Sequence, residues 1–198
     1  MLNKIFVIFL IFFHFTCTNV LGNEQISFDV NEIEILEDGN KIIGSNRGKV
    51  STGDGIIIEA NNFIFIKSEN ILNASGKVLI KDTINNYNIY SENIKYEKDY
   101  EKIYSKGKTK GEINSRYILN SSDVVFFRDK KILSSNKNTS ILDNDEQTYL
   151  ELKKFSFSIE DELLKGEKIL VNLEYNLPQN DKFFFESGIF DFKKKSFI

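Results

Sequence analysis

Histidine and cysteine, the side chains that most often carry catalysis, occur once each in this sequence, as His14 and Cys17. Both lie in an apolar N-terminal stretch that has the features of a leader, so the chain beyond it contains neither residue. This leaves the exported part without disulfides, without zinc sites built on these ligands, and without nucleophiles activated by histidine. We therefore expect no enzyme and no cofactor.

Acidic residues gather once in a pattern that could bind a metal ion. The stretch Asp143-Asn-Asp-Glu146 resembles the first ligands of a calcium loop. The glycine and the distal glutamate that complete such a loop are missing, so the stretch predicts a solvated turn instead.

Residues 1–22 have the features of a secretory signal peptide. Lys4 precedes an apolar run from Ile5 to Phe15, and small or polar residues follow up to Gly22. The run is too short to cross about 30 Å of hydrocarbon. We predict cleavage after Gly22 and one exported domain over residues 23–198. A lipid anchor on Cys17 and an uncleaved anchor helix are the alternatives.

The rest of the chain is organised around a repeat, best seen from Ile58 to Phe65. Its pattern is apolar, any, small, any, any, apolar, any, apolar, and it starts at residues 28, 58, 89, 119, 150 and 185, in steps of 30, 31, 30, 31 and 35 residues. A fixed period of this length indicates stacked units that share one continuous core.

A second apolar segment follows within each unit and contains a residue suited to a bend. In Ile71–Ile80 this residue is Gly76, and the corresponding segments place Gly107, Asn136 and Gly166 there. Glycine recurs where a bulge or turn needs a positive φ. Each unit therefore predicts two short strands and two turns.

Turn chemistry favours antiparallel pairing of these strands. Asp38-Gly39 and Asp54-Gly55 each separate two alternating runs, which is a strong hairpin signal. We predict an all-β fold, a twisted antiparallel β-jellyroll or sandwich of about 30-residue repeats, open at both ends. A right-handed parallel β-helix is the competing architecture.

Charge and register exclude two other classes of function. The leader holds one lysine and no acid, so the remainder keeps 25 basic and 29 acidic residues without a basic stripe. We therefore expect no nucleic acid partner. The position after the small residue of each repeat is Asn61, Glu92, Ser122, Lys153 and Gly188, so the register signals no carboxylate pair for glycoside hydrolysis.

Two segments and a turn of this chain resemble those of a known family. A leader followed by Ile-x-Ala-x-x-Phe-x-Phe at 58–65, Ile-Leu-Asn-Ala-Ser-Gly-Lys-Val at 71–78 and the turn at 81–87 resembles the OstA-like family of lipopolysaccharide-transport proteins. The resemblance covers Phe28 to the end. Within the family, which includes LptA and LptC, the chain is most similar to the N-terminal periplasmic domain of the assembly protein LptD, although the cysteines of many LptD proteins and a following barrel are absent.

This resemblance implies a jellyroll whose apolar interior carries the acyl chains of lipopolysaccharide through the periplasm. It implies lipopolysaccharide, other jellyroll proteins of the transport bridge and, for an LptD fragment, outer-membrane assembly components as partners, with possible attachment to the outer membrane. The candidate lipid-binding residues are the inward positions Ile58, Phe63, Phe65, Ile94, Tyr96, Val124, Phe126, Phe155 and Phe157.

The two ends of the stack carry further expectations. The first repeat has no earlier unit to cover it, so we predict a partner-binding edge at Phe28, Val30, Ile33 and Ile35. The last residues stop in mid-repeat, as in a truncated domain, and we expect Phe190 and Phe192 to lack a covering layer. The alternative function is a structural β-repeat protein of the envelope with a closed core and no ligand.

Overall fold

The computed structural model describes residues 26–197, and the predicted leader lies outside them. Within this range the regular structure consists of β-strands and three short 3-10 turns at Glu37–Gly39, Lys67–Glu69 and Lys98–Tyr100. No helix in the described range is long and apolar enough to cross a membrane. The all-β prediction is therefore confirmed.

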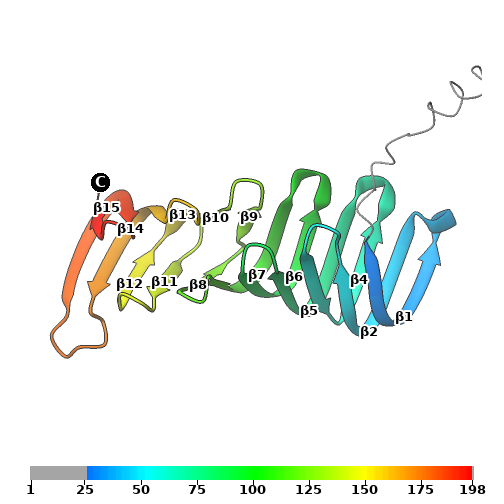
Figure 1. The fold of residues 1–198 in the computed structure, drawn as a ribbon, viewed down its shortest axis with the longest axis horizontal. Helices are drawn as coiled ribbons and strands as arrows, with labels where there is room; N and C mark the ends of the chain where they lie inside the picture. The colour runs from blue at the N-terminus through cyan, green and yellow to red at the C-terminus, as the bar shows by residue number, and fades with distance from the viewer. Residues whose placement is uncertain (1–25, 198) are drawn as a thin grey trace, which may run out of the picture.

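The strands follow one another along a single elongated stack (Figure 1). They belong to one sheet of 16 strands, and the largest are 10 to 12 residues long. Their bounds are β1 Ser27–Leu36, β2 Lys41–Ser51, β3 Ile56–Ala60, β4 Asn62–Ile66, β5 Ile71–Asp82, β6 Tyr87–Glu97, β7 Lys102–Ile113, β8 Tyr117–Ser122, β9 Val125–Phe127, β10 Ile132–Ser135, β11 Thr139–Asp143, β12 Thr148–Leu152, β13 Lys154–Ser158, β14 Leu163–Leu173, β15 Asp181–Asp191 and β16 Ser196–Phe197.

All pairings between these strands are antiparallel, as the Asp-Gly hairpins predicted. β5 pairs with β6 over its whole length, and β6 continues the pairing with β7. β3 and β4 both pair with β5, so together they act as one long strand that bends between them. The parallel β-helix is thereby excluded, and the arrangement is a β-jellyroll.

Each long strand bends near its middle, and backbone conformation explains where. Gly76 and Gly107 have φ values of +77° and +82°, as the repeat predicted. Gly166 does not have a positive φ, and Lys168 has one of 53° instead. A Cβ at Gly166 would lie 2.8 Å from Leu152 Cδ1 and 3.2 Å from the Lys154 carbonyl oxygen, so this glycine permits the close packing seen here.

The turns form two rows along the stack. The first row, along the upper side of Figure 1, comprises residues 37–40, 67–70, 98–101, 128–131, 159–162 and 192–195. Successive turns are joined by backbone hydrogen bonds such as Lys98 N to Asn70 O, 3.1 Å long. The second row is joined in the same way and comprises residues 52–55, 83–86, 114–116, 144–147 and 174–180.

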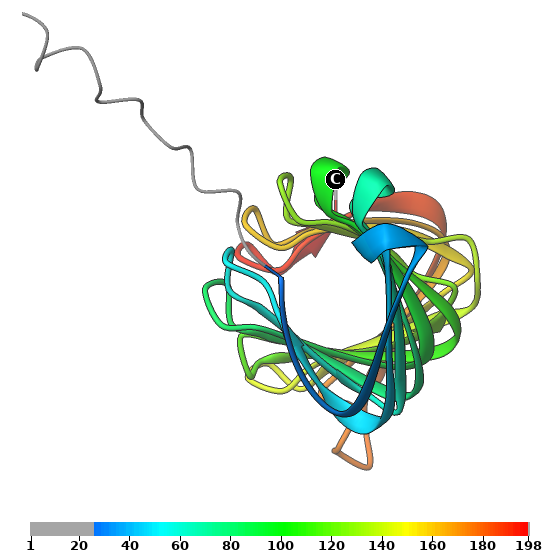
Figure 2. The same cartoon turned by 90° about the vertical axis from the view of Figure 1, so that its right-hand side faces the viewer.

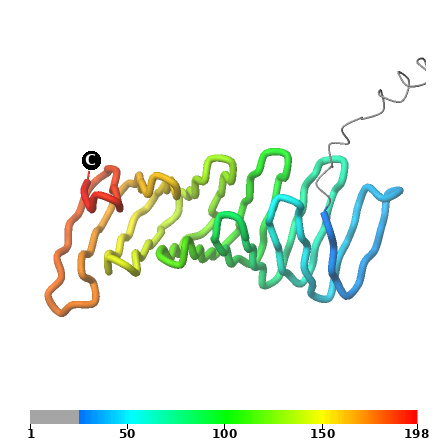
Figure 3. Tube along the Cα trace, viewed as in Figure 1, coloured from blue at the N-terminus to red at the C-terminus, as the bar shows by residue number. Residues whose placement is uncertain are grey.

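One hydrophobic core fills the space that the bent strands surround, which Figure 2 shows along the long axis. Ile58, Ile80, Leu150 and Phe157 are 0% exposed. Buried residues alternate with more exposed ones along the strands of the middle layers, as β5 and β6 show. The buried side chains form one cluster along the stack. Figure 3 shows the path of the chain from one end of this stack to the other.

The C-terminal end carries an aromatic cluster. Phe190 packs edge-on against Phe192 with ring centroids 4.8 Å apart, and Phe185 stacks on Phe197 at 3.8 Å. Phe190 is 4% exposed and Phe192 2%, so the expectation that they lack a covering layer was wrong. β16 and the neighbouring aromatic rings cover them because the chain folds back after residue 191.

Candidate functional site

The structure brings all nine candidate lipid-binding residues into the one interior. They lie on β3, β4, β6, β9 and β13, with Val124 just before β9, and their exposed fractions range from 0% to 7%. Equal spacing along the repeat explains this, because residues at the same position of successive strands face the same side. The interior is packed closed at their level.

A cavity of 580 Å³ opens into this interior at the N-terminal end; we call it the vestibule. Its apolar wall consists of Ile26, Phe28, Ile42 and Phe65. The rings of Phe28 and Phe65 lie 6.2 Å apart. Its rim is formed by residues of the first three turns of the first row, namely Gly39, Lys67, Ser68, Asn70, Lys98 and Asp99.

Beyond the vestibule the two rows of turns face each other along a seam. Between residues 26 and 197 no backbone hydrogen bond joins one row to the other, and the contacts across the seam come from side chains. The opposite side of the jellyroll is different, because there the chain passes through the bends and the ladders of β5, β6 and β7 continue on both sides of each bend. The seam is therefore the side that can open without breaking a β-ladder.

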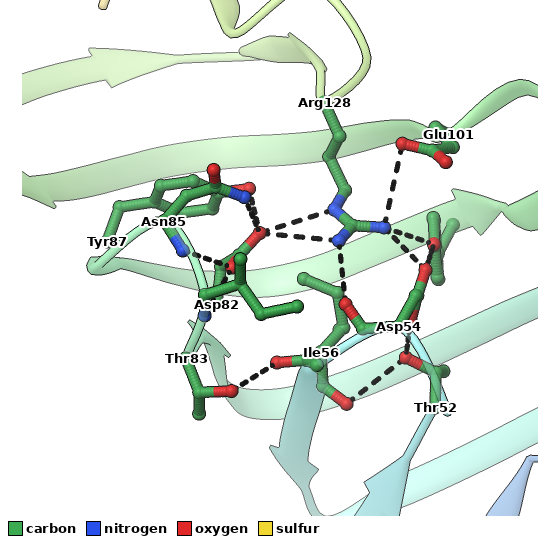
Figure 4. A network of polar contacts seen from close by, with 12 residues as sticks. Thr52, Asp54, Ile56, Asp82, Thr83, Asn85, Tyr87, Glu101 and Arg128 are labelled. Carbon is green, nitrogen blue, oxygen red and sulfur yellow. Dashed lines mark hydrogen bonds and ion pairs between the residues drawn. The ribbon is translucent and has the colours of Figure 1, made fainter.

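Arg128, in the first row, closes the middle of the seam (Figure 4). Its Nη1 donates to Asp54 Oδ2 at 2.6 Å, its Nη2 donates to the Asp54 carbonyl at 3.2 Å, and both Nε and Nη2 lie 3.4 Å from Asp82 Oδ2. Tyr96 Oη donates to Asp54 Oδ2 at 2.9 Å, and Glu101 lies 4.0 Å from the guanidinium. The Arg128 side chain is 5% exposed and that of Asp82 0%. We call these five residues the Arg128 cluster.

The acids of this cluster are held in their charged forms. Burial alone would raise the pKa of Asp54, but the hydrogen bond from Thr52 and the charge of Arg128 outweigh it and lower that pKa below its usual value. Burial is likewise overcome at Asp82 by hydrogen bonds from Tyr87 and Asn85, so its pKa is lowered too. The cluster is therefore an ion network at neutral pH.

A second arginine closes the seam further along, from the second row. Arg116 holds Asp143 with two parallel bonds of 2.9 and 2.7 Å and reaches Glu162 of the first row at 3.1 Å. Tyr117 Oη also donates to Glu162, at 2.7 Å. The side chain of Asp143 is 1% exposed, so the predicted solvated turn at 143–146 was wrong for its first residue. Within residues 26–197 no acidic group is arranged to hold a metal ion.

The contacts across the seam show that the rows are staggered. The fourth turn of the first row, at 128–131, meets the first two turns of the second row through Asp54 and Asp82. The sixth turn meets the fourth, because Lys195 lies 2.6 Å from Glu146. Among the described residues, the turns at 37–40 and 67–70 consequently have no second-row turn opposite them. The vestibule occupies that gap.

The predicted partner edge lies on β1, which pairs with β2 alone. Ile33 and Ile35 lie opposite Gly44 and Ile42, so they are on the inward face. They are 55% and 61% exposed, whereas Phe28 and Val30 are half-buried. β15 at the other end also has a largely unpaired side, where Phe183 is 46% exposed.

Sequence reasoning did not identify the arginines of the seam. The chain has three arginines, at 47, 116 and 128, among 26 basic residues, and two of them lie in the seam. Arginine offers a planar fork of donors that lysine lacks, so its rarity in a lysine-rich chain was the available signal. Their acidic partners were not predictable from the register, because they lie in turns or at strand ends, outside the repeated positions.

Comparisons with known proteins leave the family of this chain open. No protein-family model matches it, and no curated protein matches it. Among solved structures it is similar to the crystal structure of LptH, the LptA homologous periplasmic component of the conserved lipopolysaccharide transport device from Pseudomonas aeruginosa. The similarity covers 81% of this chain and 94% of that chain, at 9% identity and a TM-score of 0.31. A similarity at this level establishes neither family nor function.

Proposed function

We propose that this chain is a non-enzymatic component of lipopolysaccharide transport that shelters acyl chains in its interior. The observation that supports this most is an unbroken apolar interior whose long side is closed only by side chains across the seam. Acyl chains cost about 0.8 kcal/mol per methylene exposed to water, so transfer between membranes needs such an interior. Opening the seam would admit them while the strands stay paired.

Joining to like-folded proteins forms the second part of this proposal. β1 and β15 each present an unpaired side, and strand addition at such an edge supplies main-chain hydrogen bonds to a partner. Inward apolar residues at both ends would then become continuous with the partner's interior. From the motif resemblance we propose that this assembly lies in the periplasm and that the chain is the N-terminal domain of an outer-membrane assembly protein.

A photo-crosslinker at Phe65 or Phe126 in growing cells tests this function. We expect adducts with lipid A at both positions. Ile64 is the matched control, because it neighbours Phe65 on β4 but is 40% exposed on the outer face. Crosslinks confined to the chain itself would favour the structural envelope protein with a closed core, which the tight packing around Phe126 also fits.

A further inference from the structure

We propose that the Arg128 cluster divides the interior into two compartments, an inference that rests on the proposed function. The vestibule takes a single acyl chain of an anionic amphiphile while the cluster is closed. The compartment behind it, represented by Phe126, receives that chain only when the cluster releases the seam.

The vestibule has the size and chemistry of a small-ligand site. Its 580 Å³ falls within the range of about 300–1,000 Å³ for such pockets. Ile26, Phe28 and Ile42 offer an apolar wall, and Phe65 connects it to the buried core. Lys67 and Lys98 supply cationic groups at the rim, where the head of an inserted amphiphile would remain.

The vestibule ends where the Arg128 cluster begins. The turn at 98–101 contributes Lys98 and Asp99 to the rim of the vestibule and Glu101 to the cluster. Tyr96, just before this turn, hydrogen bonds to both Arg128 and Asp54. A chain that moves along the seam from the vestibule therefore meets this ion network first.

Phe126 reports the compartment behind the cluster. It is 1% exposed and lies two residues before Arg128 in the chain. Its ring makes an edge contact of 4.7 Å with Tyr87, whose hydroxyl donates to Asp82. Access to Phe126 from the seam thus requires the cluster to separate.

The test uses purified protein and hexadecyl phosphate with a diazirine at the end of its chain, with adducts mapped by mass spectrometry. In the wild type we expect adducts on peptides containing Phe28, Ile42 or Phe65 and few on the peptide containing Phe126. The uncharged hexadecyl maltoside analogue should label the vestibule less, because it gains nothing from Lys67 and Lys98.

Asp54→Asn should raise labelling of the Phe126 peptide about tenfold, since losing one charge-assisted hydrogen bond shifts an opening equilibrium by that order. Tyr96→Phe removes a neutral hydrogen bond of the same cluster and should act in the same direction with a smaller effect. Glu59→Gln is the matched control, because Glu59 pairs with Lys81 on the outer face, 2.7 Å away. Circular dichroism and the thermal transition verify that each variant is folded.

Four outcomes would overturn the inference. Equal labelling of the vestibule and Phe126 in the wild type would show that the cluster is no barrier. Labelling confined to the vestibule in folded Asp54→Asn and Tyr96→Phe proteins would show that passage is controlled elsewhere. Labelling of Phe126 without the vestibule would leave the proposed function standing with another entry, whereas no labelling at either place would contradict both proposals.

Discussion

The N-terminal end and the middle of the jellyroll are built from the same repeat, yet their inward residues differ in exposure. Ile33 and Ile35 on β1 are 55% and 61% exposed, whereas Phe63 and Phe65, at the same repeat positions one unit later, are 1% and 7% exposed. The side chains are equally apolar, so composition does not explain the difference. An inward residue is buried where its strand has a neighbour on both sides and a second-row turn lies across the seam. Because the two rows are staggered, the first layers have no second-row turn opposite them.

The largest effect should come from emptying the closed core beyond the N-terminal end. Phe157→Ala should lower the free energy of unfolding by about 3–5 kcal/mol, because Phe157 is 0% exposed and packs against Tyr117 and Phe192. Phe28→Ala at the half-buried N-terminal end should cost clearly less. Urea unfolding of both variants measures this, and equal losses would mean that the two regions are packed alike.

The second largest loss of stability should follow from removing the positive charge of Arg128 from the seam. Arg128→Met leaves Asp54 and Asp82 without their shared counter-charge and should cost about 3 kcal/mol. Arg47→Met is the control, because Arg47 is 47% exposed and lies 3.6 Å from Glu59, a pair worth at most about 1 kcal/mol. Similar unfolding curves for the two variants would contradict a special role for the middle of the seam.

Acid should lower the stability that the Arg128 cluster contributes to the seam. The pKa values of Asp54 and Asp82 are lowered in the folded state, so the stability they contribute is complete above the ordinary aspartate pKa of about 3.9 and is lost as pH falls through the folded values. The thermal transition should therefore drop below about pH 4. Asp54→Asn should flatten this dependence, and an unchanged slope would exclude Asp54 as a contributor.

The smallest effect should follow from Ile33→Ala. Its side chain is 55% exposed, so its loss should change the free energy of unfolding of the isolated chain by less than about 1 kcal/mol. If β1 receives a partner, the same variant should weaken capture of a like-folded jellyroll in a pull-down. A large loss of stability in the isolated chain would show that β1 is already covered.

The sequence predicted the strands and their hairpins because both depend on local signals. The near-constant period placed Phe63, Phe126 and Phe157 in one interior, and the Asp-Gly turns at 38–39 and 54–55 set the antiparallel order. The Arg128 cluster was not predictable in this way. Arg128 and Asp54 are 74 residues apart, and their meeting depends on how far the two rows are displaced by the tilt and twist of every strand between them.

Sequence reasoning also misjudged individual residues whose role depends on tertiary packing. Gly166 matched the bending glycines of other repeats, but its neighbour Leu152 determines why no side chain fits there. Asp143 belonged to a polar stretch, yet two bonds from Arg116 allow it to be buried. The contact at Gly166 comes from the other segment of the same repeat, and the contacts at Asp143 come from the preceding repeat.

The stagger of the rows gives the stack an inherent direction. At the N-terminal end the first row extends past the second, and at the other end the loop at 174–180 of the second row extends past the first (Figure 1). If both rows of turns ended at the same level, a neighbouring domain could dock on that end in two orientations related by a half-turn. Because one row projects beyond the other at each end, only one orientation places a projecting row against a recessed row. A series of such domains would therefore share a single polarity and one uninterrupted seam.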